Sequence, residues 1–323
     1  MWLKQQLERG ALSLLSGGGR RAPAILIYHR VLPQPDPLFP GEVHREQFDR
    51  QLGWLKSRFN VLPLLDAVQL AAQGRLPPRS ACITFDDGYA DNAEVALPVL
   101  QQHGLHATFF IATGFLDGGR MWNDTVIEAV RRAPGDVFDA TALDLGRHAI
   151  GNWDARRSAI RALVGQLKYL PMEQRLQAVG KVAQLSGAEL PRDLMMSSAQ
   201  LRKLHGAGMG IGGHTVNHPI LARLPAAEAR REIAQGRAAL EAALDAPVRM
   251  FAYPNGKPGQ DYLPEHVAMV REMGFDAAVS TSWGASRGET DWYQLPRFTP
   301  WDQGIGKFGL RLARNMLQPA ERV

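Results

Sequence analysis

The chain has 323 residues, of which 45% are hydrophobic and 21% are charged, a composition typical of a folded globular protein rather than a disordered one. The net charge of +5 is modest for this length, and no basic stripe is interleaved with aromatic residues, so we expect no nucleic-acid partner. The single cysteine, Cys82, excludes a framework of intramolecular disulfides, and no apolar run approaches the roughly 20 residues of a membrane-spanning helix.

The first 22 residues form a separate N-terminal segment with the spacing of a short amphipathic helix. Glu8 and Arg9 interrupt its apolar run, so it does not match a signal peptide and we expect a cytoplasmic protein. The helix either contacts the inner surface of a membrane peripherally or packs on the rest of the chain. Its apolar face comprises Leu3, Leu7, Leu12, Leu14 and Leu15.

The run Ala24–His29 predicts a buried strand that ends in a titratable side chain. Four prolines between residues 33 and 40 then impose an irregular loop. A histidine at the end of a strand indicates a functional site, although a core histidine bonded to the backbone is the alternative. We therefore retain His29 as a candidate catalytic residue.

Amphipathic and apolar segments then alternate along the chain. Helices are predicted at 45–59, 66–74 and 91–103, and strands at 81–85 and 107–112. This alternation is typical of a parallel sheet or a barrel, in which each helix returns the chain to the start of the next strand.

The strand at 81–85 ends in two adjacent acids, Asp86 and Asp87, followed by Gly88. Carboxylates at the carboxyl end of a parallel strand lie at the edge where α/β proteins carry their chemistry. Consecutive side chains of a strand point in different directions, so the two acids cannot share one role. Like charges side by side are costly without a cation, which favours a metal site over an N-cap for the following helix.

Residues 121–205 interrupt the alternation; they are rich in Arg, Ala and Leu, and their valines and leucines recur at helical spacing. We predict here an insertion of several helices between two strands, with a structural or partner-binding role for most of it. Trp122, at its start, is a candidate for contact with a ligand.

A second chemical motif follows the insertion. Residues 208–213 form a short apolar segment, and His214 and His218 come next, four positions apart. On a helical turn two such histidines share a face and can hold a divalent metal, with Asp87 as a third, oxygen ligand. Surface or capping histidines are the alternative for this pair taken alone. Zinc is the first candidate, and nickel, cobalt and iron suit the same ligands.

The segments Thr84–Gly88 and His214–His218 resemble the first two motifs of the NodB-type polysaccharide deacetylases, carbohydrate esterase family 4. The resemblance extends over residues 25–299, and the run Ile27–Val31 is similar to the opening strand of the branch that acts on biofilm poly-N-acetylglucosamine. It implies an α/β fold, a distorted (β/α)7-type barrel over residues 23–310 that carries the insertion. It also implies a metal-dependent hydrolase of carbon–nitrogen bonds other than peptide bonds.

The implied substrate is an N-acetylated glycan, either an amino-sugar polysaccharide or a lipid-linked glycan. Asp86 is expected to act as general base, and His29, which in the biofilm branch reaches the active site, to donate a proton to the leaving amine. Asn255 lies at the place of the third motif, where this chain lacks the usual arginine and final aromatic residue. Its backbone N–H remains a candidate oxyanion donor, since that role needs no particular side chain.

The remaining segments complete the expected barrel. The helix 226–244 is expected to expose Glu232 to solvent on its charged face. Arg297, in a last strand at 294–298, is expected to pair with Asp86 in place of the missing arginine, with a surface salt bridge as the alternative. Residues 311–323 are expected to be a tail, and the family's fifth motif, a leucine followed closely by histidine, is absent from it.

Aromatic side chains are expected to bind substrate by stacking on sugar faces, with packing in the core or at the rim as the alternative. These are Tyr89, Trp122, Tyr253 and Trp292. Two other functions stay open. A hydrolase of the same fold can act on a non-carbohydrate bond such as that of a ureide ring, and a catalytically silent glycan-binding protein would agree with the missing motifs.

Overall fold

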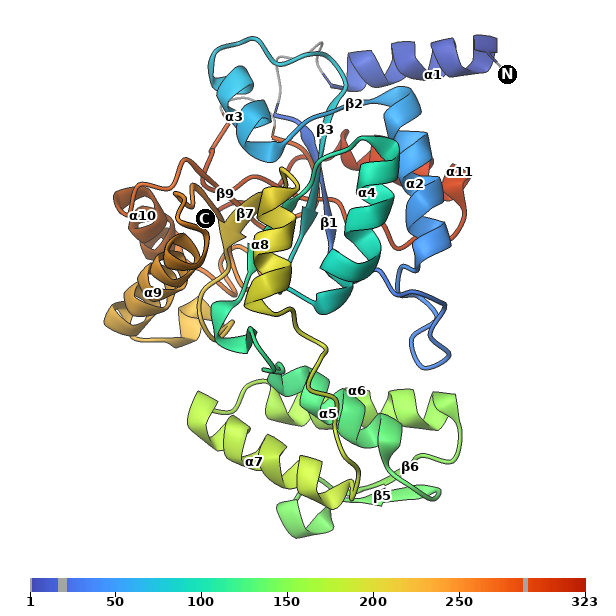
Figure 1. Cartoon of the computed structure of the whole chain (residues 1–323), viewed down its shortest axis with the longest axis vertical. Helices are drawn as coiled ribbons and strands as arrows, with labels where there is room; N and C mark the ends of the chain where they lie inside the picture. Colours follow the sequence, from blue (N-terminus) through green and yellow to red (C-terminus); the bar gives the residue numbers. More distant parts are fainter. Residues whose placement is uncertain (1, 17–21, 287–289) are drawn as a thin grey trace. The chain divides into compact units, whose positions relative to one another are not determined.

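The structure is a computed structural model and describes residues 2–16, 22–286 and 290–323 (Figure 1). It contains two compact units, each with a hydrophobic core of its own. Unit 1 comprises Met1–Gln34, Val43–Leu116 and Met196–Val323. Unit 2 comprises Pro35–Glu42 and Asp117–Met195.

Unit 1 is built on a seven-stranded sheet in which all paired strands are parallel. The strand order is β1-β3-β4-β7-β8-β9, and the short β2 pairs with the start of β3. The strands are β1 (Ala24–Tyr28), β2 (Asn60–Val61), β3 (Ser80–Phe85), β4 (Thr108–Ile111), β7 (Gly210–Gly213), β8 (Met250–Ala252) and β9 (Ala277–Val279).

The predicted last strand, residues 294–298, closes the curled sheet between its two edges. Leu295 forms a parallel bridge with Val279 of β9, and Phe298 forms another with Leu26 of β1. Because this segment lies between the two edge strands, it leaves neither edge open. The predicted distorted (β/α)7-type barrel is thereby confirmed.

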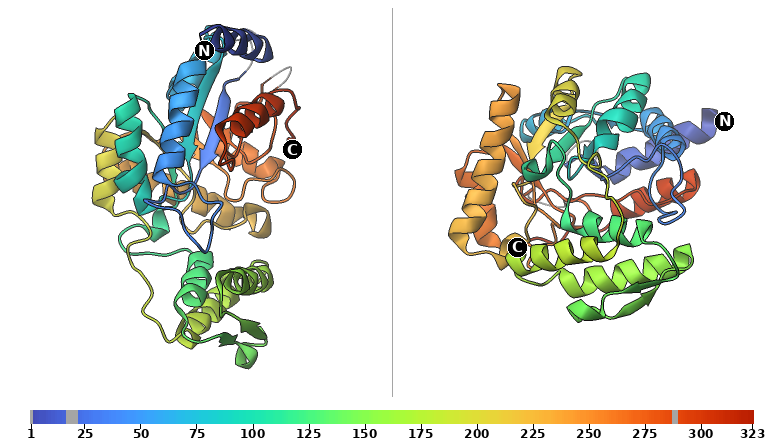
Figure 2. Two further views of the ribbon diagram at one scale, coloured as in Figure 1. Left: turned by 90° about the vertical axis from the view of Figure 1, so that its right-hand side faces the viewer. Right: turned by 60° about the horizontal axis from the view of Figure 1, so that its bottom comes forward.

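Helices surround the strands of unit 1 (Figure 2). Their apolar faces pack on the outer side of the sheet, as α2 does through Phe48, Leu52 and Leu55, which are fully buried. The helices are α1 (Trp2–Leu15), α2 (Arg45–Arg58), α3 (Leu64–Ala72), α4 (Leu97–His103), α8 (Ser198–Gly206), α9 (Ala226–Leu244), α10 (Pro264–Glu272) and α11 (Ile305–Asn315). One π-helical turn, Asn92–Ala96, leads into α4.

Side chains along each strand alternate between an outer and an inner buried cluster. In β3, Ala81 and Ile83 belong to the outer cluster that the helices cover, and Cys82 belongs to the inner one. The period of two residues is that of an extended strand. Positions after Cys82 with the same parity, Thr84 and Asp86, therefore also face the interior of the barrel.

Unit 2 consists of three helices and a two-stranded antiparallel sheet around a separate core. The segment 35–42 joins it through Asp36, whose carboxylate receives two hydrogen bonds from Arg131 of α5, at 3.0 and 2.7 Å. The elements are α5 (Trp122–Arg132), β5 (Val137–Asp139), β6 (Arg147–Ala149), α6 (Trp153–Leu167) and α7 (Met172–Leu185). Residues 196–205, expected at the end of the insertion, belong to unit 1.

The N-terminal helix α1 packs on the outer cluster of unit 1 through Leu12, which is 5% exposed, whereas Leu14 is 83% exposed. The side chains of Leu3 and Leu7 lie outside the described residues. Contact of this helix with a membrane stays a prediction. None of the helices in the described part of the chain combines the length and apolarity needed to cross a bilayer.

The expectation of a tail from residue 311 is wrong at its start, because α11 continues to Asn315. Phe308 and Leu312 of this helix are fully buried in the outer cluster. The helix is therefore part of the barrel unit, since its apolar face has a partner surface on α2 and on Phe298 of the closing segment.

Gly212 in β7 has no side chain, which leaves room for Phe110 of β4 and for the backbone of β8. A Cβ at this position would clash with Cδ1 of the buried Phe110 and lie 3.0 Å from the carbonyl oxygen of Met250. We expect Gly212→Ala to lower the free energy of unfolding by about 1–3 kcal/mol, because a fully packed interior cannot yield. Urea unfolding followed by circular dichroism measures this. Gly53→Ala in α2, whose Cβ would meet only ordinary contact at 3.6 Å, is the control and should be neutral or stabilising.

Candidate active site

The chemical groups of the site lie where parallel strands end. Asp86 and Asp87 follow β3, and His214 follows β7, two places along the sheet. Backbone hydrogen bonds continue the ladder past the strands, from Asp86 N to Tyr28 O at 2.9 Å and from His214 N to Ile111 O at 3.1 Å. Residues distant in sequence are therefore fixed side by side by the sheet itself.

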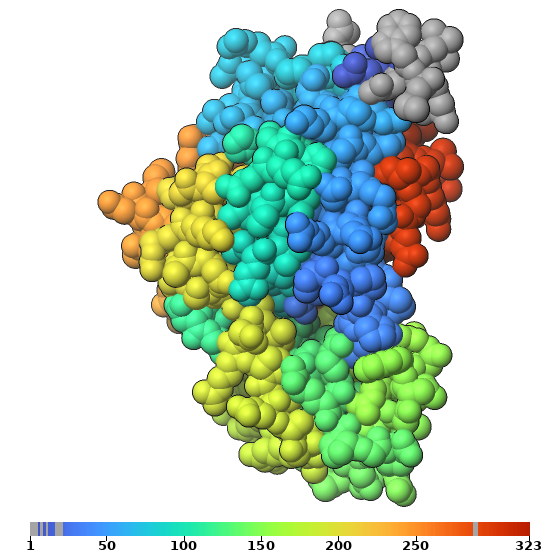
Figure 3. All heavy atoms as spheres, turned by 45° about the vertical axis from the view of Figure 1, so that its right-hand side comes forward, coloured from blue at the N-terminus to red at the C-terminus, as the bar shows by residue number. Residues whose placement is uncertain are grey.

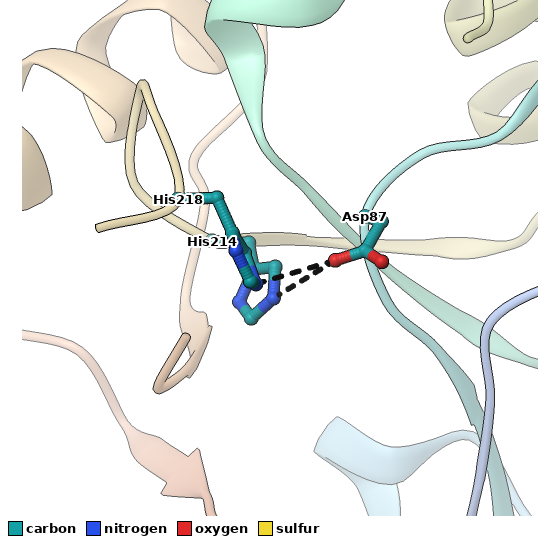
Figure 4. A group of neighbouring side chains, drawn as sticks. All are labelled: Asp87, His214 and His218. Atoms are coloured by element: carbon teal, nitrogen blue, oxygen red, sulfur yellow. Dashed lines mark ion pairs between the residues drawn. The ribbon is translucent and has the colours of Figure 1, made fainter. Parts of the chain in front are cut away.

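Asp87, His214 and His218 converge, as the sequence predicted (Figure 4). The Nε2 atoms of both histidines lie 3.4 Å from Oδ1 of Asp87. One ligand atom from each of the three side chains lies within 4.8 Å of the others. The two rings are 4.7 Å apart between centroids and inclined by 61°. The three side chains can thus reach one small ion together.

The prediction that the two histidines share a helical turn is wrong. Residues 214–218 form a loop in which Thr215 and His218 have φ values of 66° and 52°, outside the right-handed helical region. His214 still extends the ladder of β7 through its hydrogen bond to Ile111, so no helix can begin there. The loop, rather than a helix, brings the second ring back to the first.

The donor atoms fit a bound cation. Oδ1 of Asp87 is buried and has no hydrogen-bond partner among the described residues. Nδ1 of His214 lies 2.8 Å from the carbonyl oxygen of Ala252. When Nδ1 carries the proton that this contact requires, the Nε2 lone pair of the neutral ring faces Asp87. Facing lone pairs repel unless a positive charge lies between them, and two imidazoles with a carboxylate suit a divalent metal.

The electrostatics of the site agree with this. Burial alone would raise the pKa of Asp87, but His218 and His214 hold that pKa well below its usual value. Burial lowers the pKa of His218 to about 4, so its ring is neutral at pH 7 and keeps a lone pair for coordination. Burial would also lower the pKa of His214, but the carboxylates of Asp87 and Asp86 raise it instead. The site attracts positive charge.

Arg297 pairs with Asp86, as predicted, and the alternative of a surface salt bridge is excluded because Arg297 is 1% exposed. The contact is bidentate, with Nη1 and Nη2 at 2.6 and 2.7 Å from the two carboxylate oxygens. The guanidinium also donates to Ser280 O at 2.8 Å and to Thr84 Oγ1 at 3.2 Å. Burial would raise the pKa of Asp86, but the charge of Arg297 lowers it, so the carboxylate stays ionised.

His29 lies at the end of β1 with an exposed side chain. Its backbone carbonyl accepts a hydrogen bond of 2.9 Å from Asn92, and Asp91 accepts one of 3.1 Å from the N–H of Val31. The strand end is therefore fixed by the turn that follows the paired acids. His29 is also close enough to contribute to the lowered pKa of Asp86. Its role as proton donor stays a prediction.

Asn255 follows β8, at the same edge of the sheet, with a φ of 59°. Its carbonyl accepts a hydrogen bond of 2.7 Å from Oγ1 of Thr281. In the described part of the chain its backbone N–H has no hydrogen-bond acceptor. A donor with no internal partner is what an oxyanion site requires, and this role stays a prediction.

Two of the four aromatic rings expected to bind sugar are buried, which corrects the expectation for them. Tyr253 is fully buried and stacks on Tyr262, with ring centroids 4.0 Å apart. Tyr89 is 4% exposed, and the guanidinium of Arg30 lies 4.7 Å from its ring centroid. Side chains with so little solvent exposure have no free face for a sugar.

The other two rings are partly buried. Trp292 packs against the inner cluster of the barrel. Trp122 belongs to unit 2, where it packs on that unit's core and Arg175 lies 5.0 Å from its ring centroid. Contact of either ring with a glycan stays a prediction.

The sequence analysis missed Glu232, which it assigned to the solvated face of α9. Its Oε2 accepts hydrogen bonds from the N–H groups of Val216 and Asn217 at 3.0 and 2.8 Å, and Oε1 accepts one from the Asn217 side chain at 2.7 Å. Gly236, one turn later, admits the loop, since a Cβ there would lie 2.8 Å from the Thr215 carbonyl. Only the spacing of Glu232 and Gly236 on one helix face could have signalled this contact.

Removing the guanidinium of Arg297 should destabilise the fold, because the buried carboxylate of Asp86 then has no counter-charge. Arg297→Met leaves Asp86 charged and unpaired in the barrel, and we expect it to lower the free energy of unfolding by about 3–5 kcal/mol. The double variant Asp86→Asn/Arg297→Met should recover part of the loss. Urea unfolding of both single variants and the double variant measures the coupling. Strictly additive losses would contradict a direct energetic dependence between the two side chains.

Glu232→Gln should weaken metal binding without contact to the metal. Replacing the carboxylate loosens the loop that carries His218, and we expect a loss of about 10- to 100-fold in affinity for Zn²⁺. Competition with a chromogenic chelator measures it. Glu228→Gln, on the same helix and exposed, is the matched control. Equal affinities of the two variants would remove Glu232 from the support of the site.

Comparisons with known proteins agree with this site. A family model described as polysaccharide deacetylase matches residues 73–278, more than half of the chain. The putative polysaccharide deacetylase YxkH of Bacillus subtilis is 33% identical over 89 residues, which are 27% of this chain and 30% of that protein. A poly-beta-1,6-N-acetyl-D-glucosamine N-deacetylase of Staphylococcus aureus is 38% identical over 73 residues, 22% of this chain and 25% of that protein. The matched stretches thus span less than a third of either relative.

Among solved structures, IcaB from Ammonifex degensii aligns with a TM-score of 0.57 and 20% identity, over 90% of this chain and 97% of that one. At this identity the likeness concerns the fold, and it agrees with the curled parallel sheet closed by residues 294–298. By its family match and its barrel, the chain belongs to the polysaccharide deacetylase family, the NodB-type proteins of carbohydrate esterase family 4.

Proposed function

We propose that this protein is a metal-dependent hydrolase that removes N-acetyl groups from an amino-sugar polysaccharide or a lipid-linked glycan. The observation that carries the proposal is the convergence of Asp87, His214 and His218 next to Asp86, whose carboxylate a buried arginine holds. The substrate class rests on membership of the family and on the relative from Staphylococcus aureus, a poly-beta-1,6-N-acetyl-D-glucosamine N-deacetylase.

Asp87, His214 and His218 would hold the metal, with zinc as the first candidate and nickel, cobalt or iron as alternatives. Three protein ligands are the number typical of catalytic rather than structural zinc sites. When bound, such a cation polarises a carbonyl group and lowers the pKa of water. The lowered pKa of His218 supports this assignment, because its ring needs no deprotonation at pH 7 before it can bind.

Asp86 would act as the general base. It takes a proton from the water molecule that attacks the acetyl carbonyl, which requires an ionised carboxylate within reach of the ligands. Arg297 keeps it ionised, and each oxygen retains a second lone pair beside the one given to the guanidinium. The bidentate contact also fixes the carboxylate plane, so the base is held in one orientation before substrate arrives.

The leaving amine would receive its proton from His29 as the carbon–nitrogen bond breaks, which gives acetate and a free amino sugar. An exposed histidine can be recharged from solvent after each turnover. The backbone N–H of Asn255 would donate to the oxyanion that forms on the carbonyl oxygen. Both groups lie at the carboxyl edge of the sheet that carries the acids.

The test measures acetate release from N-acetylglucosamine oligomers together with metal content. Chelation should abolish release, and added Zn²⁺ should restore it, because the metal activates the attacking water. Asp87→Asn should lose the metal. Asp86→Asn and His29→Gln should keep the metal and lose turnover by about 10²- to 10⁴-fold, the usual contribution of a general base or acid.

Three outcomes would count against the proposal. Acetate release that survives complete removal of metal would exclude a metal-dependent reaction. Binding of oligomers without any acetate release by the metal-loaded wild type would favour a silent glycan-binding protein. Hydrolysis of a ureide without release of acetate would assign a different carbon–nitrogen bond. Full turnover in His29→Gln would remove only His29 from the reaction.

A further inference from the structure

Two exposed tryptophans, which the sequence analysis did not single out, lie on loops of unit 1. Trp283 follows β9, and Trp301 follows the closing segment 294–298. The two residues are 37% and 61% exposed, and their ring centroids are 6.4 Å apart. Figure 3 shows the C-terminal segment, in red, on the surface of unit 1. Neighbouring large rings left at a surface indicate a binding site more strongly than a single exposed ring does.

Trp301 lies just past the end of the closing segment, at the carboxyl edge of the barrel that carries the catalytic groups. The N–H of Phe298 donates to Ile25 O at 2.8 Å, and the N–H of Ile27 donates to Phe298 O at 3.0 Å. The closing segment therefore runs parallel to β1, whose chain continues into His29. Barrel enzymes carry their substrate sites at this carboxyl edge.

Trp283 is connected to the proposed base through a short path. The carbonyl of Ser282 accepts a hydrogen bond of 3.0 Å from the N–H of Arg297, whose guanidinium binds Asp86. The next residue is Trp283, and its ring centroid lies 5.7 Å from that of Phe298. The ring thus packs on the outer side of the closing segment, whose next residue inward, Arg297, reaches Asp86 in the interior of the barrel.

The pair is held in place by charged and polar contacts. The guanidinium of Arg311 lies 4.7 Å from the ring centroid of Trp283 and 5.8 Å from that of Trp301. Arg311 is bound in turn by the buried carboxylate of Asp302, with 2.5 Å between Nη1 and Oδ2. Gln47 donates to the backbone carbonyl of Asp302 at 3.2 Å. Rings fixed in this way lose little conformational entropy when a ligand binds.

We propose that Trp283 and Trp301 form a further glycan subsite, on which a sugar unit beyond the one being deacetylated stacks its C–H face. The inference rests on the proposed function, since it takes the glycan chain as occupant. Tryptophan combines a large apolar face with an N–H donor, which suits a ring that is apolar on its faces and polar at its rim. In the adjoining Arg311–Asp302 pair the positive charge of the guanidinium is compensated by a carboxylate, so it is not left to attract anionic lipid headgroups, which favours a sugar over a lipid bilayer.

The test compares wild type, Trp301→Ala and Trp301→Phe in the zinc-loaded chain of 323 residues. The probes are a short and a long N-acetylglucosamine oligomer, and the readouts are calorimetric affinity and the KM for acetate release. Wild type should bind the long oligomer more tightly than the short one. Trp301→Ala should lose most of this difference, with about tenfold weaker binding of the long oligomer, and Trp301→Phe should keep most of it.

Trp153→Ala is the matched control, because it removes a tryptophan that is 44% exposed in unit 2, and it should bind both oligomers as wild type does. Equal length dependence in Trp301→Ala and wild type would overturn the subsite even when acetate is released. Length-dependent binding lost in Trp301→Ala, by a protein that releases no acetate, would support the subsite and overturn the hydrolase. Binding of anionic phospholipid vesicles that Trp301→Ala loses, without oligomer binding by wild type, would assign the rings to a membrane and overturn the subsite.

Discussion

Two imidazole nitrogens and a buried carboxylate oxygen meet at one point on the carboxyl edge of this barrel, and nothing else in the described chain binds that oxygen. Such a meeting of lone pairs is unfavourable in a protein interior unless a positive charge lies among them. The requirement for that charge connects the fold to the chemistry. The sheet holds ligand atoms from strands that are distant in sequence close enough together to contact one cation.

The paired acids take separate roles because of the geometry of their strand. Asp86 continues the parity of side chains that face the barrel interior and meets the buried guanidinium of Arg297 there. Asp87, with a φ of 77°, leaves that regular pattern and turns to the histidines. One acid is therefore compensated by a fixed arginine, and the other faces the two histidines that would hold the proposed metal. Adjacent like charges become tolerable when each has its own counter-charge.

Much of the support for the site comes from parts of the chain that carry no motif. The arginine usual in the third motif of the family is absent, and Arg297 from the closing segment takes its place beside Asp86. The histidine loop is held by Glu232 of α9 through three hydrogen bonds. Pairing a buried acid or holding a ligand loop requires a charged group at a given point in space, and that group can come from any part of the sequence.

The sequence by itself determined a parallel sheet or barrel, the Asp86–Asp87 strand end and the three metal-binding candidates, because alternation of apolar residues and paired ligand types are local signals. The resemblance to the family then specified the barrel. The tertiary structure alone decided which neighbours complete them. It turned the predicted helical turn at His214–His218 into a loop and placed the Glu232 carboxylate on that loop. It also enclosed Tyr253 in the core. These outcomes depend on contacts between segments far apart in the chain, and the energies of such contacts exceed the local preferences that a sequence pattern records.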